Sequence, residues 1–139
     1  MLTLEPTSAR NYEMPSQSGA ESAGIMMFLM TLPNPGLKTV AAVHAAAEWF
    51  EKTRLRDVAF KATGDDGRKL VASPGAGPVW ARYYEIGTDR PIFGDRDKTI
   101  HDSVNEISKE RRQGYSWFSE APKQALEQYA RWSAAHPRP

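Results

Sequence analysis

Cysteine is absent from the 139-residue sequence. This absence excludes disulfide bonds, thiolate metal sites and cysteine nucleophiles. Long apolar runs are also missing, since the most apolar stretch, residues 25–32 (IMMFLMTL), is far too short to span a bilayer. The first ten residues contain neither the basic nor the apolar region of a signal peptide, so we expect none in this chain.

Charge of one sign is not in excess either. Lys and Arg number 18 against 17 Asp and Glu, which gives a net charge of +1. The composition therefore does not indicate a surface that attracts nucleic acid or an acidic membrane. Any site for an anion must be local.

The sequence contains no zinc, EF-hand, P-loop, dinucleotide-binding or serine-hydrolase motif. His44, His101 and His136 are scattered along the chain, and we expect each of them to be exposed or structural. Spacing alone also selects no catalytic pair among the acidic residues.

The length allows one domain with a real core. Helix signals occur at residues 18–32, 37–55, 102–112 and 121–136. Ser18 followed by Glu21 has the pattern of a capping box, and Gly114 suits the end of the third segment. Apolar positions recur at helical spacing most clearly in the second segment.

Strand signals are fewer. Residues 58–72 alternate on both sides of a Gly-Asp-Asp-Gly turn, which predicts a small hairpin. Residues 79–86 alternate again, and a strand there would put Trp80, Arg82 and Tyr84 on one face as a stacking platform. The sequence thus predicts a mainly α fold with a small β portion.

Arginine and aromatic residues are concentrated between residues 79 and 117. The set comprises Arg82, Arg90, Arg96, Arg111, Arg112, Trp80, Tyr83, Tyr84, Phe93, Tyr115 and Trp117. A guanidinium group can grip a carboxylate with two hydrogen bonds, and aromatic rings stack on apolar ligand faces. This composition suits a flat, anionic, hydroxyl-rich ligand.

Plainer interpretations of the same residues stay open. Arg82 could pack its stem on Trp80 or Tyr84 at a strand surface, and Arg96 could pair with an adjacent aspartate in its loop. The acids and arginines of residues 106–112 could form i,i+4 pairs within one short helix. A nucleic-acid interface is a further alternative, against which the near-zero net charge and the interleaved acids count.

Three motifs follow one another along this stretch: WARYYE at 80–85, TDRPIFGDRD at 88–97 and ERRQGYSW at 110–117. Upstream, ARNYEMPS occupies residues 9–16. Together these segments closely resemble the C-terminal segment of the family 10 polysaccharide lyases, which are pectate lyases. The resemblance covers nearly the whole chain, and it implies that residues 1–139 are the C-terminal part of one catalytic domain.

That resemblance implies a fold, a reaction and three site residues. The fold is an (α/α) toroid, a helical barrel with a small β portion, of which this chain would be an incomplete part. The reaction is the calcium-dependent anti-β-elimination of α-1,4-linked polygalacturonate, which gives unsaturated oligogalacturonates. Arg10 matches the arginine proposed as the catalytic base, and Arg82 and Arg96 match arginines that bind the substrate's carboxylates. Tyr115 and Trp117 belong to a matching motif without an assigned role.

Calcium (Ca2+) is the cofactor that the resemblance implies. Its acidic ligands are expected in the N-terminal part of the family domain, so we expect no metal ligand in this chain. Full-length members of the family are expected to be secreted or periplasmic.

The expected partner is polygalacturonate or oligogalacturonate, with no nucleic acid and no membrane. Helix faces that stay apolar would favour self-association. Two alternatives to an active lyase remain open, namely a non-catalytic module that binds oligogalacturonate and a truncated, inactive fragment.

Overall fold

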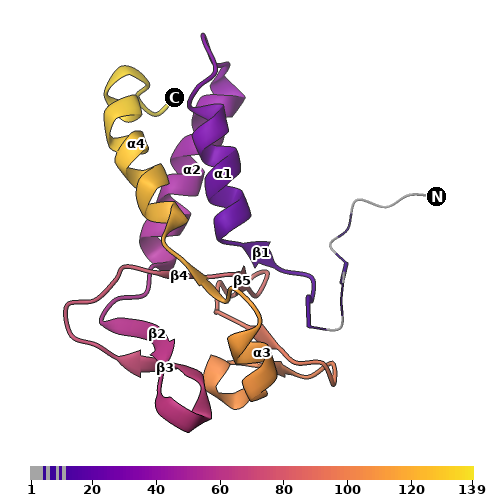
Figure 1. Ribbon diagram of the computed structural model, residues 1–139. Helices are drawn as coiled ribbons and strands as arrows, with labels where there is room; N and C mark the ends of the chain where they lie inside the picture. The colour runs from indigo at the N-terminus through magenta and orange to yellow at the C-terminus, as the bar shows by residue number, and fades with distance from the viewer. Residues whose placement is uncertain (1–4, 6, 9, 11) are drawn as a thin grey trace.

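Three helices form a layer at one end of the molecule, and short strands lie at the other end (Figure 1). The computed structural model describes residues 5, 7, 8, 10 and 12–139. The layer consists of α1 (Ala20–Leu29), α2 (Leu37–Thr53) and α4 (Ala121–Ala135), which pack against one another. The helices predicted over 37–55 and 121–136 are therefore confirmed, with ends within two residues of those expected.

The described part of the chain contains eight strands in four antiparallel pairs. The strands are β1 (Gln17–Ser18), β2 (Val58–Ala62), β3 (Arg68–Ala72), β4 (Trp80–Ala81), β5 (Tyr83–Tyr84), β6 (Phe93–Gly94), β7 (Ile100–His101) and β8 (Phe118–Ser119). β1 pairs with β5, β2 with β3, β4 with β8, and β6 with β7. The β2–β3 pair is the predicted hairpin.

The expectation of a mainly α fold with a small β portion is wrong. Helix accounts for 40% of the structure and strand for 19%, so the fold is mixed. The expected (α/α) toroid is wrong as well, because one layer of three helices packs beside small antiparallel sheets. Strands of two residues show no alternation in the sequence, and in the pairs β1–β5 and β4–β8 the two partners lie far apart along the chain. The sequence pattern therefore underestimated the β content.

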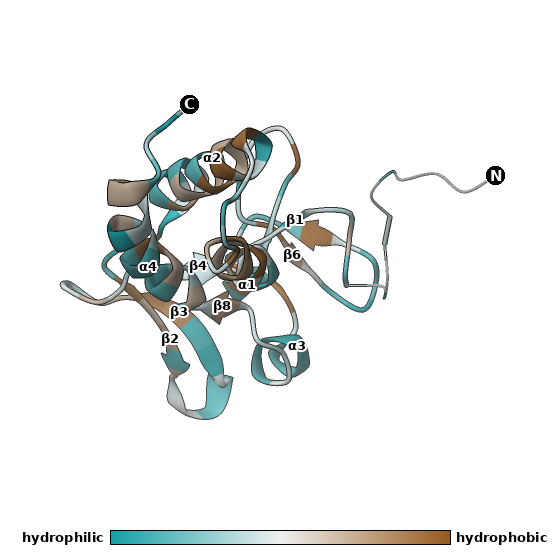
Figure 2. Ribbon diagram, turned by 90° about the horizontal axis from the view of Figure 1, so that it is seen from above, coloured by the Kyte–Doolittle hydropathy of each residue, from teal (hydrophilic) through white to brown (hydrophobic). Residues whose placement is uncertain are grey.

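Helix α1 is apolar over most of its surface (Figure 2). Ala23 and Met26 are buried, whereas Ile25 and Phe28 are each 62% exposed. A helix that is apolar all round is typical of one covered on several sides. Among the described residues, none of the helices combines the length and hydrophobicity needed to cross a membrane.

The start of α1 differs from the predicted capping box. The N-cap residue is Gly19 rather than Ser18, and the Ser18 hydroxyl donates instead to the Glu21 carboxylate. A Cβ atom on Gly19 would lie 2.5 Å from the carbonyl oxygen of Ala81. Close approach of α1 to β4 therefore requires glycine at this position.

Two glycine substitutions test this contact. Gly19→Ala is expected to destabilise the fold by about 1–3 kcal/mol, because the methyl group must push α1 away from β4. Gly24→Ala in the same helix is the matched control, since a Cβ there meets no atom within 4 Å. It is expected to stabilise the fold by about 0.5–1 kcal/mol. Urea unfolding measures both, and equal effects would contradict the close approach.

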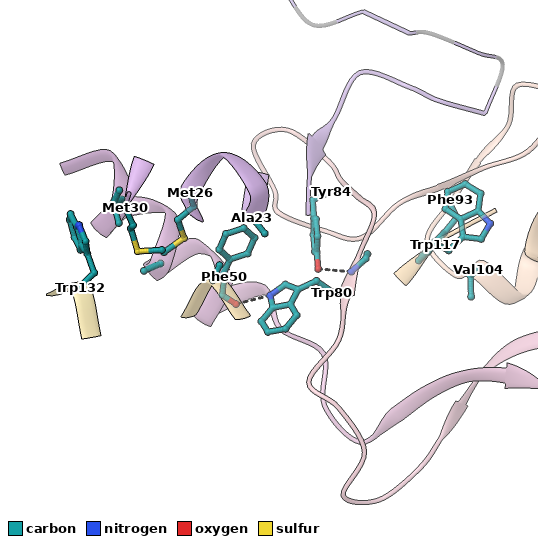
Figure 3. Close-up of a cluster of buried hydrophobic side chains, with 14 of the residues drawn as sticks. Ala23, Met26, Met30, Phe50, Trp80, Tyr84, Phe93, Val104, Trp117 and Trp132 are labelled. Carbon is teal, nitrogen blue, oxygen red and sulfur yellow. Dashed lines mark hydrogen bonds between the residues drawn. The ribbon is translucent and has the colours of Figure 1, made fainter. Parts of the chain in front are cut away.

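The core joins the helical layer to the strands (Figure 3). The indole N–H of Trp80 donates to the carbonyl of Phe50 in α2 at 2.9 Å. The Tyr84 hydroxyl accepts from the N–H of Ala81 at 2.9 Å and donates to the carbonyl of Thr53 at 3.2 Å. Trp80 and Tyr84 are fully buried, so they hold the strand region against α2 and do not form the predicted stacking platform.

Candidate functional site

Two tyrosine rings lie at the centre of the candidate site. Tyr12 comes from the segment before β1, and Tyr115 follows the short helix α3 (Lys109–Gln113). Their ring centroids are 5.1 Å apart, with the ring planes nearly perpendicular at 80°. This edge-to-face contact is a favoured geometry for an aromatic pair, and it ties the N-terminal segment to the end of α3. We refer to Tyr12 and Tyr115 as the tyrosine pair.

The structure brings the three predicted site arginines together around the tyrosine pair. The Cζ atoms of Arg10 and Arg96 lie 5.5 and 5.7 Å from the centroid of the Tyr12 ring. The Cζ atom of Arg82 lies 4.4 Å from the centroid of the Tyr115 ring. All three distances are within the range of cation–π attraction. Three separate segments thus direct positive charge to one place.

Arg82 interrupts the strand that the sequence predicts over residues 79–86. Its backbone N–H donates to the carbonyl of Trp117 at 2.7 Å, and its carbonyl accepts from the N–H of Gly19 at 3.0 Å. Strand pairing therefore changes partner at this residue, from β8 on one side to β1 on the other. The prediction that Arg82 shares one strand face with Trp80 and Tyr84 is wrong.

The side chain of Arg82 lines an open pocket of about 440 Å³. Glu13, Glu21 and Tyr83 line the same pocket. The guanidinium lies 3.5 Å from a carboxylate oxygen of Glu21, and its Nε donates to the Tyr83 hydroxyl at 3.3 Å. The pocket is thus lined by two acids and a partly exposed cation, and Arg82 is the group in it that can bind a carboxylate.

Arg96 lies in the loop between β6 and β7. Its Nε donates to Oε1 of Glu110 at 2.8 Å, so this ion pair reaches α3 instead of a neighbouring aspartate. Asp95 accepts from the N–H of Ser108 at 2.7 Å and from the Ser108 hydroxyl at 2.9 Å. Because Ser108 is the N-cap of α3, these bonds fix the Arg96 loop to that helix.

The helix predicted over residues 102–112 is divided. A 3₁₀ turn, η2 (Val104–Glu106), comes first, and α3 follows it. The expected i,i+4 pairs do not form within it, because Glu110 pairs with Arg96 and the Glu106 carboxylate lies 3.3 Å from His101. Two serine caps, Ser103 and Ser108, start the two pieces separately.

Glu13 is the hydrogen-bonding hub beside the tyrosine pair. Its carboxylate accepts from the backbone N–H and from Nε of Arg10, both at 3.2 Å, and from the Tyr115 hydroxyl at 2.7 Å. The Tyr115 hydroxyl also lies 2.5 Å from the Tyr83 hydroxyl. These bonds connect Arg10 to Tyr115 and Tyr83 through a single acid, and Arg10 also donates directly from Nη1 to the Tyr12 hydroxyl at 2.9 Å.

The hub changes the protonation chemistry of its members. The hydrogen bond from Tyr115 lowers the pKa of Glu13, burial opposes that effect, and the bonds from Arg10 add to it. Burial, followed by the bonds to Tyr83 and Glu13, raises the pKa of Tyr115. The hydrogen bond and charge of Glu13 raise the pKa of Arg10. Arg10 is therefore held in its charged form in this arrangement.

Glu13 also makes the folded state sensitive to acid. Because its pKa is lowered, its contribution to stability is complete above about pH 4.3 and is lost as the pH falls through the folded-state pKa. We expect Glu13→Gln to show a smaller drop in Tm between about pH 5 and about pH 3 than the wild-type protein. Glu48→Gln, at an exposed glutamate of α2, is the control and should keep the wild-type drop. Equal drops in all three proteins would contradict the role of Glu13.

Tyr12, Glu13 and Glu21 were not predicted as site residues. The one local signal is the i,i+3 spacing of Arg10 and Glu13, which is too common to identify a site. Tyr115, for which the resemblance gave no role, has its ring beneath the guanidinium of Arg82. Trp117 is fully buried and donates from its indole to the carbonyl of Arg111 at 2.8 Å, so it is structural.

Each of the three histidines makes hydrogen bonds within the described part of the chain. His44 is buried, with Nδ1 2.7 Å from the Tyr129 hydroxyl and Nε2 2.7 Å from the carbonyl of His136. Its bonds fix α4 against α2. Within the described residues, no three His, Cys, Asp or Glu side chains are grouped as a metal site requires.

Comparison with known proteins gives a family. The model of the pectic acid lyase family matches residues 1–126. No curated protein matches the chain. Among solved structures, a family 10 polysaccharide lyase from Cellvibrio cellulosa is similar, with a TM-score of 0.84, 32% sequence identity and 95% of this chain covered. A point mutant of that enzyme in complex with trigalacturonic acid is similar over 94% of this chain, with a TM-score of 0.83 and 32% identity.

This chain matches only part of each solved structure. This chain spans 41% of the length of each of the two solved structures. The family match covers most of this chain, and it includes all three predicted site arginines. The chain belongs to the pectic acid lyase family.

Proposed function

We propose that this chain forms the arginine-bearing side of a pectate lyase active site that binds oligogalacturonate. One observation carries the proposal: Arg10, Arg82 and Arg96 converge on the tyrosine pair from three separate segments. The adjoining pocket of about 440 Å³ exposes Arg82 to a ligand. The complex of the similar lyase with trigalacturonic acid supports the choice of substrate.

The proposed reaction is an elimination next to a carboxylate. A base removes the proton from C5 of a galacturonate residue, and those bonding electrons form the double bond between C4 and C5. The C4–O bond breaks, and the glycosidic oxygen leaves and takes up a proton. Negative charge builds up on the carboxylate during proton removal, so Arg82 and Arg96 would stabilise the transition state by binding that carboxylate. Arg10 is the proposed base, which acts once alkaline pH removes the proton that Glu13 helps it to hold.

That full-length members of this family use calcium as a cofactor stays a proposal. When bound, calcium would neutralise part of the charge of the substrate's carboxylates. In the part of the chain that the structure describes, no cluster of His, Cys, Asp or Glu fits such an ion. We therefore assign no calcium ligand and no step through calcium to these residues.

Binding can be tested apart from catalysis. Calorimetric titration of the purified chain with trigalacturonate is expected to give binding that Arg82→Ala weakens by about 10-fold to 100-fold, the usual loss for a charge-assisted hydrogen bond. Arg131→Ala removes an exposed arginine of α4 and should leave affinity almost unchanged. Equal affinities of the wild-type protein and Arg82→Ala would overturn the proposed site.

The two alternatives predict different outcomes in an elimination assay. A non-catalytic module binds trigalacturonate but releases no unsaturated product from polygalacturonate, with calcium or with a chelator. An inactive fragment neither binds nor cleaves. Export of full-length family members stays a prediction, as does self-association through exposed helix faces.

A further inference from the structure

We propose that Arg111 is a positioning residue that accepts the Glu110 carboxylate when a substrate carboxylate takes over Arg96. The inference rests on the proposed function and deepens it, because it explains how Arg96 is released for the substrate. Arg111 is a cation outside the three predicted site arginines.

Arg111 is a buried cation with incomplete pairing. The residue is 6% exposed, and within the described part of the chain its Nε has no hydrogen-bond partner. The carboxylate beside it belongs to Glu110, whose Oε1 is 3.9 Å from Nη2 of Arg111. This separation is too long for a hydrogen bond. A buried charge normally needs close pairing, since removing it from water is costly.

Glu110 is placed between two guanidinium groups. The same oxygen, Oε1, is 2.8 Å from Nε of Arg96 and 3.9 Å from Nη2 of Arg111. The side chain of Glu110 is 64% exposed, so it has room to turn. A movement of about 1 Å would exchange one hydrogen bond for the other.

Arg111 itself is fixed. Its Cζ lies 4.3 Å from the centroid of the Tyr12 ring, and its carbonyl accepts from the indole of Trp117 at 2.8 Å. Glu110 can therefore move to Arg111, while Arg111 stays in place beneath Tyr12. A substrate carboxylate at Arg96 would repel Glu110, and a hydrogen bond to Arg111 would offset the lost ion pair.

A double-mutant cycle with trigalacturonate tests this exchange. Glu110→Gln is expected to tighten binding by about threefold, because Arg96 loses its competing carboxylate. Arg111→Met is expected to weaken binding by about fivefold in the wild-type background and to change it little in the Glu110→Gln background. A loss of equal size in both backgrounds would overturn the inference, since it would mean that Arg111 acts only through its own charge or through Tyr12. If Arg111→Met fails to fold, Arg111→Lys replaces it in the cycle, because lysine keeps a buried cation.

A readout without ligand separates this inference from the proposed function. Removing Arg96 in the variant Arg96→Ala should let Glu110 pair with Arg111 directly. The side-chain N–H signals of Arg111 in NMR spectra should then exchange with water more slowly than in the wild-type protein. Unchanged exchange would overturn the transfer of Glu110, whether or not trigalacturonate binds. Absence of trigalacturonate binding in the wild-type protein would instead count against the proposed function.

Discussion

Replacing Arg112 by methionine is expected to lower the free energy of unfolding by about 3–5 kcal/mol. Arg112 is 5% exposed, and its guanidinium donates hydrogen bonds to three backbone carbonyls. Nε donates to Arg68 at 2.9 Å, Nη1 to Ile107 at 2.5 Å and Nη2 to Asp66 at 2.8 Å. Methionine fills similar space but donates nothing, so these carbonyls lose their partner. Urea unfolding followed by tryptophan fluorescence measures the change.

The expected loss is large because Arg112 connects two parts of the fold. Asp66 and Arg68 lie at the tip of the β2–β3 hairpin, whereas Ile107 precedes α3. Arg54→Met is the matched control, since Arg54 pairs with Glu51 at the surface and should contribute only about 0–1 kcal/mol. Similar losses in the two variants would contradict the role of Arg112 as a link. A lower unfolding slope in Arg112→Met would indicate that the hairpin detaches separately.

Regular elements were predictable from the sequence, and tertiary pairings were not. Helix α2 shows its apolar stripe in the sequence, with Val40, Val43, Ala47 and Phe50 all buried. The strand break at Arg82 leaves no such signal, because it depends on bonds to Gly19 and Trp117. The roles of Trp80 and Tyr84 could not be predicted either. An aromatic residue in a strand suits a core and a stacking platform equally well, and only burial in the structure distinguishes the two.

The sequence predicted which arginines form the site, but not how their side chains are arranged or which partners they have. Motif resemblance selected Arg10, Arg82 and Arg96, and the structure brings all three to the tyrosine pair. The resemblance indicated Arg10 as the base but not Glu13, whose carboxylate raises the pKa of Arg10. Glu110 was likewise assigned to pairs within its own helix, although its partner Arg96 is fourteen residues away. Side chains that turn toward another segment give no periodic signal.

Arg10→Ala is expected to lower the rate of product formation from polygalacturonate by at least about 100-fold, the usual contribution of a general base. Ultraviolet absorbance of the unsaturated product measures this rate, at alkaline pH and with added calcium. Arg10→Lys keeps a positive charge near Glu13 but not the reach of the guanidinium, so it should not restore the rate. A wild-type rate in either variant would contradict the role of Arg10 as base. A folded wild-type chain without product would favour the non-catalytic module.

Glu13 should control the pH at which Arg10 can act. A base must lose its proton first, and the Glu13 carboxylate raises the pKa of Arg10 by hydrogen bonding to the guanidinium and by its charge. Glu13→Gln keeps a hydrogen-bond acceptor but removes the charge, so the alkaline rise in rate should begin at lower pH in this variant. Glu48→Gln should leave the profile where it is. An alkaline rise that begins at the same or a higher pH in Glu13→Gln would contradict the role of Arg10 as base, since loss of the Glu13 charge lowers the pKa of Arg10.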